Sequence, residues 1–209
     1  MTQRLKTGTT TVGIVCKDGV VLAADMRATA GTMIVDKRAL KVHVLSDDFA
    51  VTWAGTVSEA QLLTKLAKAE LKLKEVRTNK RPIAKEAANL IAGLLYSTIR
   101  RPSMLPGVAH FLLAGKDVYG THLYDLFPDG SITLIDDFIS SGSGSVFAYG
   151  VLETHFKKDM TTDEGVKLAL LAVNTALKRD SASGNGINVL VVNKDEIKRV
   201  MHKELVCEL

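Results

Sequence analysis

The stretch KTGTTTVGIV, residues 6–15, places three consecutive threonines between a glycine and an apolar run. Thr9, Thr10 and Thr11 are β-branched, so the simplest interpretation is that they begin a strand, with Gly8 as the loop residue before it. Strands are predicted over residues 10–17 and 20–25, and the Asp18-Gly19 pair between them is typical of a two-residue turn. The chain is therefore expected to open with a β-hairpin.

Beyond the hairpin, apolar periodicity and turn signals divide the chain into alternating runs of strands and helices. In chain order the predicted elements are strands at 41–45 and 49–54, a helix capped by Ser58 that ends before Pro82, a helix at 82–100, strands at 110–114, 118–127 and 131–138, a break at SSGSGS (140–145), helices at 147–157 and after the capping box Thr161–Glu164, a strand at 187–192, and a short helix or tail at the end. Consecutive strands exclude a doubly wound parallel sheet and favour two antiparallel sheets with helices packed outside them.

Length and composition describe the class of protein. A chain of 209 residues and 22.6 kDa is expected to form one substantial domain. Hydrophobic residues make up 46%, and no apolar run approaches the roughly 18 residues that a membrane span needs. Residues 1–8 have no apolar segment typical of a secretory signal, although they are compatible with a pro-segment. A soluble globular protein without a membrane partner is expected.

The cysteines and the distribution of charge indicate which kinds of partner and which cellular compartment to expect. Cys16 and Cys207 provide neither a disulfide framework nor metal-ligand spacing, which favours a reducing cytoplasm and predicts no metal and no cofactor. The net charge is +4, and the basic excess lies mainly over residues 65–81. Because no aromatic residues interleave those lysines, a solvated helix face is favoured and no nucleic-acid partner is expected.

A threonine hydroxyl is a weak nucleophile that needs an adjacent base and donors for the oxyanion. The five histidines (His43, His110, His122, His155 and His202) lie in different sequence contexts and predict no Ser-His-Asp arrangement. A threonine at a chain N-terminus carries its own base, because an α-amino group has a pKa of roughly 7.7–8.0. One cut after Gly8 would free that amine on Thr9, and a residue without Cβ lets the Thr9 hydroxyl approach the Gly8 carbonyl. The chain is therefore a candidate for self-cleavage.

Such a site would also need a cation near the amine and hydroxyl, and a carboxylate to orient the cation. Lys41 and Asp25 are candidates only if the fold brings them beside Thr9, since each residue alone is better interpreted as a strand-surface lysine or a turn-forming aspartate. The segment SGSGS is typical of a flexible loop, and RDSASG of a helix terminus with Gly184 as its C-cap. The small residues of both segments also permit close backbone approach.

Taken together, these motifs carry a family resemblance. The segments GTTTVGI (8–14), Asp25 ahead of Arg27-Ala28-Thr29, Lys41, Ala54-Gly55, GSGS (142–145), YGVLE (149–153), MTTDEGVKLA (160–169) and RDSASG (179–184) stand in the order and spacing of a proteasome β subunit. The chain resembles the archaeal type over residues 8–192. The resemblance implies the N-terminal nucleophile hydrolase fold, an α+β four-layer αββα sandwich with two antiparallel sheets between helix layers, in which residues 1–8 are a pro-segment and residues 9–209 a single domain.

The resemblance also implies residue roles. Thr9 matches the nucleophile, and its freed amine matches the base that acts through a bound water. Lys41 matches the lysine that lowers the pKa of the hydroxyl, with Asp25 as its carboxylate partner. The group that orients the amine and the water is matched by Ser143, Asp180 and Ser183.

Substrate binding is implied in the same way. The Gly55 amide matches the oxyanion donor, and Thr29 and Gly55 match positions that pair their backbone with an extended peptide, a form of strand addition. The residues matching the specificity pocket are apolar and favour cleavage after hydrophobic residues; they are Ala28, Ala39, Trp53 and Val57. Trp53 is larger than the aliphatic residue expected there, and its bulk would narrow or close the pocket.

The function implied is a threonine endopeptidase of the proteasome core particle that self-cleaves after Gly8 and hydrolyses unfolded polypeptides. Its partners would be proteasome α subunits and other β subunits in stacked rings, seven-membered and four in number, with a regulatory ATPase acting through the α ring. A latent, unprocessed structural β subunit that supports a catalytic neighbour is the alternative. The simpler bacterial two-ring threonine protease fits less well, because the YGVLE and RDSASG segments are intact.

Overall fold

The structure of the chain is a computed structural model that describes residues 8–103 and 107–205. The expected pro-segment lies outside the described residues except for Gly8, and so does Cys207. None of the described helices is long and apolar enough to cross a membrane.

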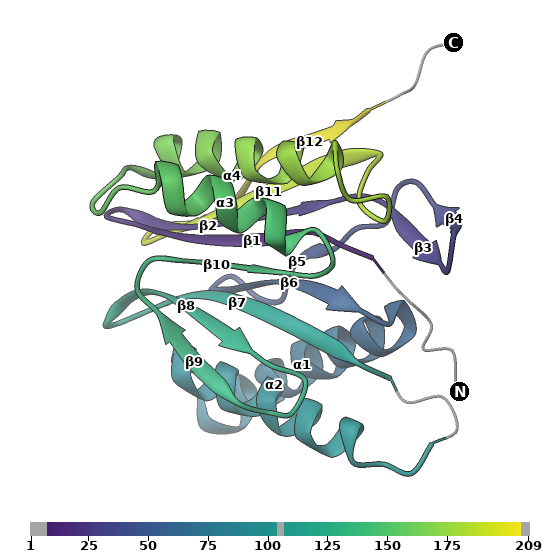
Figure 1. Cartoon of the computed structure of the whole chain (residues 1–209). Helices are drawn as coiled ribbons and strands as arrows, with labels where there is room; N and C mark the ends of the chain where they lie inside the picture. The colour runs from purple at the N-terminus through teal and green to yellow at the C-terminus, as the bar shows by residue number, and fades with distance from the viewer. Residues whose placement is uncertain (1–7, 104–106, 206–209) are drawn as a thin grey trace.

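Two five-stranded antiparallel sheets face each other and are enclosed by two pairs of helices (Figure 1). Helices α3 (Ser145–His155) and α4 (Thr162–Leu177) cover the first sheet, and α1 (Val57–Thr78) and α2 (Ala84–Ile99) cover the second. The order of layers is helix, sheet, sheet, helix. The predicted αββα sandwich is confirmed.

The first sheet carries the threonine stretch at its centre. Its strands, in spatial order, are β10 (Phe138–Ser141), β1 (Thr11–Cys16), β2 (Gly19–Asp25), β11 (Gly186–Asn193) and β12 (Ile197–Glu204). The opening hairpin is confirmed, although Cys16 pairs with Gly19, so that the turn consists of Lys17 and Asp18, one residue earlier than predicted. Because β10 and β2 flank β1, segments distant in sequence are brought to both sides of the threonines.

The second sheet and a small separate hairpin contain the other strands. The second sheet runs in spatial order β5 (Val42–Val44), β6 (Phe49–Gly55), β7 (Ala109–Asp117), β8 (Gly120–Leu126) and β9 (Ile132–Ile135), and the hairpin consists of β3 (Ala28–Ala30) and β4 (Met33–Asp36). The hairpin projects from one end of the sandwich in Figure 1. The sequence pattern did not predict β3 and β4, because they are short and β4 is exposed along its whole length.

Strand β2 shows how the sequence builds the layers. Val21 and Ala23 are buried among the side chains of the α3 and α4 layer, whereas Leu22 and Ala24 are buried in the cluster between the two sheets. Successive side chains of a strand point to opposite faces, so a strand covered on both faces is apolar at every position.

The structure corrects three predicted elements. Ser58 does not cap α1, which begins at Val57 after Thr56. The predicted strand at 131–138 is two strands in different sheets, β9 and β10, because the chain crosses from one sheet to the other after Ile135. The C-terminal segment is strand β12 rather than a helix or tail. Its exposed edge position does not require an apolar pattern, and pairing with β11 stabilises it.

The capping box of α4 is confirmed. The Glu164 backbone N–H donates to the Thr161 hydroxyl at 3.3 Å, and the Thr161 N–H donates to the Glu164 carboxylate at 2.8 Å. The box satisfies two backbone donors at the start of α4 and thereby defines where this helix begins.

Candidate active site

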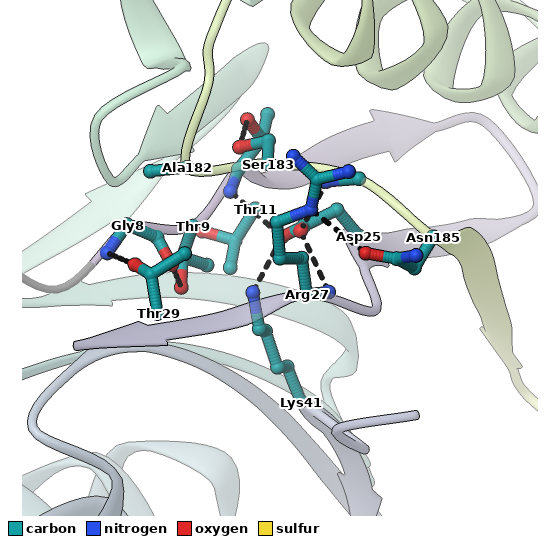
Figure 2. Close-up of polar contacts among 12 residues, drawn as sticks. Gly8, Thr9, Thr11, Asp25, Arg27, Thr29, Lys41, Ala182, Ser183 and Asn185 are labelled. Carbon is teal, nitrogen blue, oxygen red and sulfur yellow. Dashed lines mark hydrogen bonds and ion pairs between the residues drawn. The ribbon is translucent and has the colours of Figure 1, made fainter. Parts of the chain in front are cut away.

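Thr9 is buried at the entry to β1, where its side chain lies against the peptide bond that precedes it. The Thr9 hydroxyl donates to the Gly8 carbonyl oxygen at 2.5 Å (Figure 2), and only 3% of the residue is exposed. The Thr9 backbone N–H donates to Ser143 Oγ at 3.3 Å. The sequence-predicted approach of the hydroxyl to the Gly8 carbonyl is therefore present in the fold.

Gly8 occupies a position with no room for a side chain. A Cβ at Gly8 would lie 1.8 Å from the Cβ of Ala182, far inside ordinary carbon contact of about 3.5–4.0 Å. The Gly8 N–H donates to Thr29 Oγ1 at 3.2 Å. Packing against Ala182 and the bond to Thr29 together place the Gly8–Thr9 bond.

Asp25 and Lys41 form a fully buried ion pair under the threonines. Lys41 Nζ lies 2.6 Å from Asp25 Oδ1, and the two side chains are 1% and 0% exposed. The same Oδ1 accepts the Thr10 backbone N–H at 3.0 Å, and Oδ2 accepts the N–H groups of Arg27 and Gly184 at 3.0 and 2.9 Å. A buried carboxylate with this many donors is satisfied, and it ties the end of β2 to the start of β1.

Burial lowers the pKa of Lys41 below that of an exposed lysine, and the nearby Asp25 carboxylate opposes this shift. The consequence is that the Lys41 ammonium releases its proton more readily than a surface lysine. A lysine of this kind is suited to proton exchange with a neighbouring hydroxyl.

Asp180 gathers two serines and links them to the threonines. Its Oδ2 accepts hydrogen bonds from Ser143 and Ser183, both at 2.6 Å. Ser183 Oγ in turn lies 2.7 Å from Thr10 Oγ1. The three residues that the resemblance grouped together are thus in mutual contact, although they come from two segments 37 residues apart.

The SGSGS segment packs as a fixed cradle around Thr9. Gly142 has a φ of 94°, and a Cβ there would lie 2.0 Å from the Thr9 carbonyl oxygen. The Gly144 N–H donates to that oxygen at 3.3 Å. Close backbone approach, which the small residues of this segment were expected to permit, explains these glycines.

Arg27 is a residue that the sequence reasoning did not assign to the site. Its Nε donates to Asn185 Oδ1 at 2.7 Å (Figure 2). Its Nη1 donates to the Ser181 carbonyl at 2.8 Å. A Cβ at Gly184 would lie 2.3 Å from Arg27 Cζ, so this glycine makes room for the guanidinium and is not the C-cap of α4, which is Lys178. The contacts span more than 150 residues of sequence, and no local signal reports them.

The residues predicted to bind substrate lie on nearby elements. Thr29 is in β3 and contacts the Gly8 backbone through its side chain. Gly55 ends β6 with a φ of 124°, and a Cβ there would lie 2.1 Å from the Val108 carbonyl oxygen. Ala28 and Ala39 are buried, and the Ala39 N–H donates to the Met26 carbonyl at 3.0 Å. Substrate binding by these residues stays a prediction.

Trp53 and Val57 belong to the packing between the second sheet and α1. Trp53 is 1% exposed and is part of the buried cluster that includes Leu63 and Phe111, and Val57 packs against the same cluster. The indole Nε1 has no hydrogen-bond partner among the residues that the structure describes, and the ring stacks on His43 with centroids 6.2 Å apart. With this burial, Trp53 offers almost no free surface to a substrate side chain.

One expectation about the histidines is wrong. His110 lies between Ser141 and Asp125: its Nδ1 is 2.6 Å from Ser141 Oγ, and its Nε2 is in short contact with Asp125 Oδ1. The three residues come from β10, β7 and β8 and are assembled only by the fold. Within residues 8–103 and 107–205, no group of three or more His, Cys, Asp or Glu side chains is placed to hold a metal ion.

Two facing antiparallel sheets between helix layers, with a threonine cluster leading into a central strand, define the N-terminal nucleophile hydrolase fold. The chain belongs to the proteasome subunit family, whose model, described as "Proteasome subunit", matches residues 5–192. Members of this family assemble with other subunits into a proteasome complex.

Archaeal relatives match almost the whole chain. A protein of Ferroglobus placidus named "Proteasome subunit beta" is 42% identical over 198 residues, which cover 95% of this chain and 92% of the relative. A protein of the same name from Archaeoglobus fulgidus is 40% identical over 97% of this chain and 93% of its own length. One from Archaeoglobus profundus is 43% identical over 90% of this chain and 86% of its own length.

Proposed function

We propose that this chain is a β subunit of the proteasome core particle and a threonine-type endopeptidase, which cuts itself after Gly8 and then hydrolyses unfolded polypeptides. The observation that carries the proposal is the position of the Thr9 hydroxyl, hydrogen-bonded to the carbonyl oxygen of the bond to be cut. The names of the archaeal relatives support the assignment to a β subunit.

Self-cleavage would proceed by acyl transfer within the chain. Thr9 Oγ attacks the Gly8 carbonyl carbon, the hydroxyl proton passes to a base, and the carbonyl oxygen becomes an oxyanion. Collapse breaks the carbon–nitrogen bond, and the nitrogen takes up a proton and leaves as the Thr9 α-amine. The ester left on Thr9 Oγ is then hydrolysed by water, which releases the residues ending at Gly8.

The neighbouring residues would divide the remaining roles. Lys41, whose pKa burial lowers, exchanges the proton of the Thr9 hydroxyl and is held in place by Asp25. The freed amine takes the position of the N–H that donates to Ser143, where the hydrogen bonds of Ser143 and Ser183 to Asp180 orient it. An amine with a pKa near 8 is neutral enough at physiological pH to act as base for each peptide substrate.

Substrate recognition would rest on the backbone and on an apolar pocket. The Gly55 amide donates to the oxyanion, and an extended peptide pairs with the chain at Thr29 and Gly55. The residues beside them are apolar and favour cleavage after hydrophobic residues; they are Ala28, Ala39, Trp53 and Val57. Burial of the Trp53 indole supports a pocket that is shallow at its base.

Assembly would be with proteasome α subunits and further β subunits in stacked rings, with a regulatory ATPase delivering unfolded chains through the α ring. Exposed apolar side chains on the small hairpin support a covered surface: Met33 is 68% exposed and Val35 58% exposed. Apolar side chains grouped in this way mark interaction surfaces. The free buried thiol of Cys16 is compatible with the reducing cytoplasm expected from the sequence.

A latent structural β subunit is the second candidate. The burial of Trp53 favours it, because an indole with 1% exposure leaves little of a specificity pocket. The contacts of Thr9, Lys41 and Asp180 described above argue for the active subunit, since a subunit that only builds the ring has no need of them.

The deciding experiment is an intact-mass measurement of the chain after co-expression with its α partner, with and without a second β subunit, together with hydrolysis of fluorogenic peptides. The active subunit is expected to begin at Thr9. Thr9→Ala should abolish self-cleavage and hydrolysis while rings still form, and Thr9→Ser, which keeps a hydroxyl, should retain both in part. A Thr9→Ala particle that hydrolyses peptides would refute the proposal, and a wild-type chain that keeps residues 1–8 in a complete particle would favour the latent subunit.

A further inference from the structure

A Ser–His–Asp chain crosses between the two sheets beside Thr9. Asp125 in β8 contacts His110 Nε2, and His110 Nδ1 in β7 lies 2.6 Å from Ser141 Oγ at the end of β10. Strands β7 and β8 belong to the second sheet and β10 belongs to the first (Figure 1). These hydrogen bonds therefore connect two layers whose facing side chains are mostly apolar.

Asp125 determines which atom donates in each hydrogen bond from Ser141 through His110 to Asp125. An ionised carboxylate only accepts hydrogen bonds, so His110 Nε2 carries the proton that it donates to Asp125. In the neutral imidazole, Nδ1 is then an acceptor, and the Ser141 hydroxyl donates to it. The Ser141 side chain is thereby restricted to one rotamer that faces the second sheet.

Ser141 is not placed to be a second nucleophile. The residue is 5% exposed and lies in β10, where it pairs with Thr11 of β1. A polypeptide substrate must reach the attacking atom, and this hydroxyl is covered by both sheets. What the arrangement does is hold the end of β10.

The end of β10 leads directly into the cradle around Thr9. Gly142 follows Ser141, and its backbone packs so closely on the Thr9 carbonyl oxygen that a Cβ would lie 2.0 Å from it. Ser143 accepts the Thr9 N–H, and Gly144 donates to the Thr9 carbonyl. A shift at Ser141 is expected to disturb these contacts, because they are made by the three residues that follow it.

At the other end of this group of hydrogen bonds, His110 lies on the strand next to that of the predicted oxyanion donor, Gly55. His110 is paired with Ala54 in the ladder between β6 and β7, and Gly55 is paired with Ala109. The ring of His110 is also packed edge-on against Phe127, with centroids 4.8 Å apart. His110 thus has a defined place relative to Gly55.

We propose that His110 and Asp125 are positioning residues for this active site, which act through Ser141 to hold residues 142–144 on Thr9 and in register with Gly55. This inference rests on the proposed function and deepens it. Thr9 leads into the first sheet and Gly55 ends a strand of the second, and attack requires the hydroxyl and the oxyanion donor to be fixed relative to each other. Misplacement by 1 Å reduces rates by up to about a hundredfold.

The test compares two substitutions of His110 in the assembled particle. The Asn amide reaches the position of the histidine Nδ1 and can accept from Ser141, whereas the Gln amide reaches the position of Nε2 and contacts only Asp125. We expect His110→Asn to lose less than about fivefold in kcat and His110→Gln to lose about tenfold to a hundredfold, with KM unchanged in both. A role in filling space alone would favour Gln, which is the closer match in volume.

Ser141→Ala and a matched control complete the design. Ser141→Ala removes only a hydroxyl, and should lower kcat about as much as His110→Gln, without further loss in the double variant, because both break the same link. His122 contacts Asp117 at 3.2 Å in the same pair of strands and makes no hydrogen bond to β10 among the described residues. His122→Gln should leave kcat at the wild-type value.

Hydrogen exchange of residues 140–145 gives a readout that does not need activity. Exchange there should be about fivefold to tenfold faster in His110→Gln and Ser141→Ala than in the wild type and His122→Gln. A wild-type particle without peptidase activity would contradict the proposed function, and exchange would then decide this inference by itself. Wild-type exchange and wild-type kcat in His110→Gln, or a Gln variant more active than the Asn variant, would overturn it.

Discussion

Replacing Gly8 by alanine tests whether packing of the scissile bond controls self-cleavage. The new Cβ would lie 1.8 Å from Ala182 Cβ, whereas carbon atoms normally approach to about 3.5–4.0 Å, so one side must move by about 2 Å. The backbone of Gly8 lies outside the left-handed region, and the collision is the only reason for strain.

The Ala182 side of this contact resists movement. The Ala182 N–H donates to Asp180 Oδ1 at 3.2 Å, and the Gly184 N–H donates to Asp25 Oδ2 at 2.9 Å. On the Gly8 side, the N–H donates to Thr29 and the carbonyl oxygen accepts from the Thr9 hydroxyl of the neighbouring residue. We therefore expect the Gly8 carbonyl to move away from the Thr9 hydroxyl, and a displacement of this size should slow self-cleavage by about a hundredfold or more.

The assay is the time course of intact mass after the purified precursor is mixed with its α partner. The compensating variant Gly8→Ala with Ala182→Gly removes the colliding methyl, and leaves the new Cβ 2.9 Å from Ala182 Cα, a contact that small shifts relieve. The double variant should cleave itself at least about tenfold faster than Gly8→Ala. Self-cleavage of Gly8→Ala at the wild-type rate would refute the view that this packing positions the bond.

Three further predictions concern other buried groups. Lys41→Met should abolish peptide hydrolysis and lower the free energy of unfolding of the precursor by about 3–5 kcal/mol, because it leaves Asp25 as a buried unpaired charge. In urea denaturation, the loss of stability should be smaller when Asp25→Asn is added to Lys41→Met. An equal loss in the single and double variants would contradict this account. Burial raises the pKa of the Cys16 thiol from 9.0 to about 12, so the proton is held more tightly in the folded state and stability falls as pH rises above 9.0. From pH 8 to pH 10 the wild type should lose about 1.4 kcal/mol more than Cys16→Ala in urea denaturation, and equal losses would refute the shift. Trp53→Ala should cost about 3–5 kcal/mol of stability. If the indole closes the specificity pocket, the variant should also hydrolyse peptides after bulky residues faster, relative to small residues, than the wild type does in a peptide panel. An unchanged preference would show that Trp53 does not line the pocket.

The sequence alone determined most of the elements and the arrangement of two antiparallel sheets with helices packed outside them. Strand periodicity, the capping box at Thr161 and the hairpin at residues 16–19 are local signals, since each is set by neighbouring residues. The nucleophile could be proposed in the same way, because the chemistry of an N-terminal threonine depends on the residues immediately around Gly8. Even there, turn and cap positions were off by one or two residues at Lys17 and Ser58, as both depend on contacts with distant parts of the chain.

Only the tertiary structure decided which distant residues meet. Asp25, Lys41 and Asp180 each had an ordinary interpretation as a turn former, a surface lysine or a helix-terminus residue. Thr10 meets Asp25 and Ser183 only when β2 and the 179–184 loop are placed beside β1. Lys41 and Asp180 join the site through those two partners. The contacts of Arg27 and the hydrogen bonds from Ser141 through His110 to Asp125 had no local sequence signal. Hydrogen bonds between side chains depend on distances of a few ångströms between strands separated by tens to more than a hundred residues. Local pattern does not encode such distances, whereas the register of the sheets does.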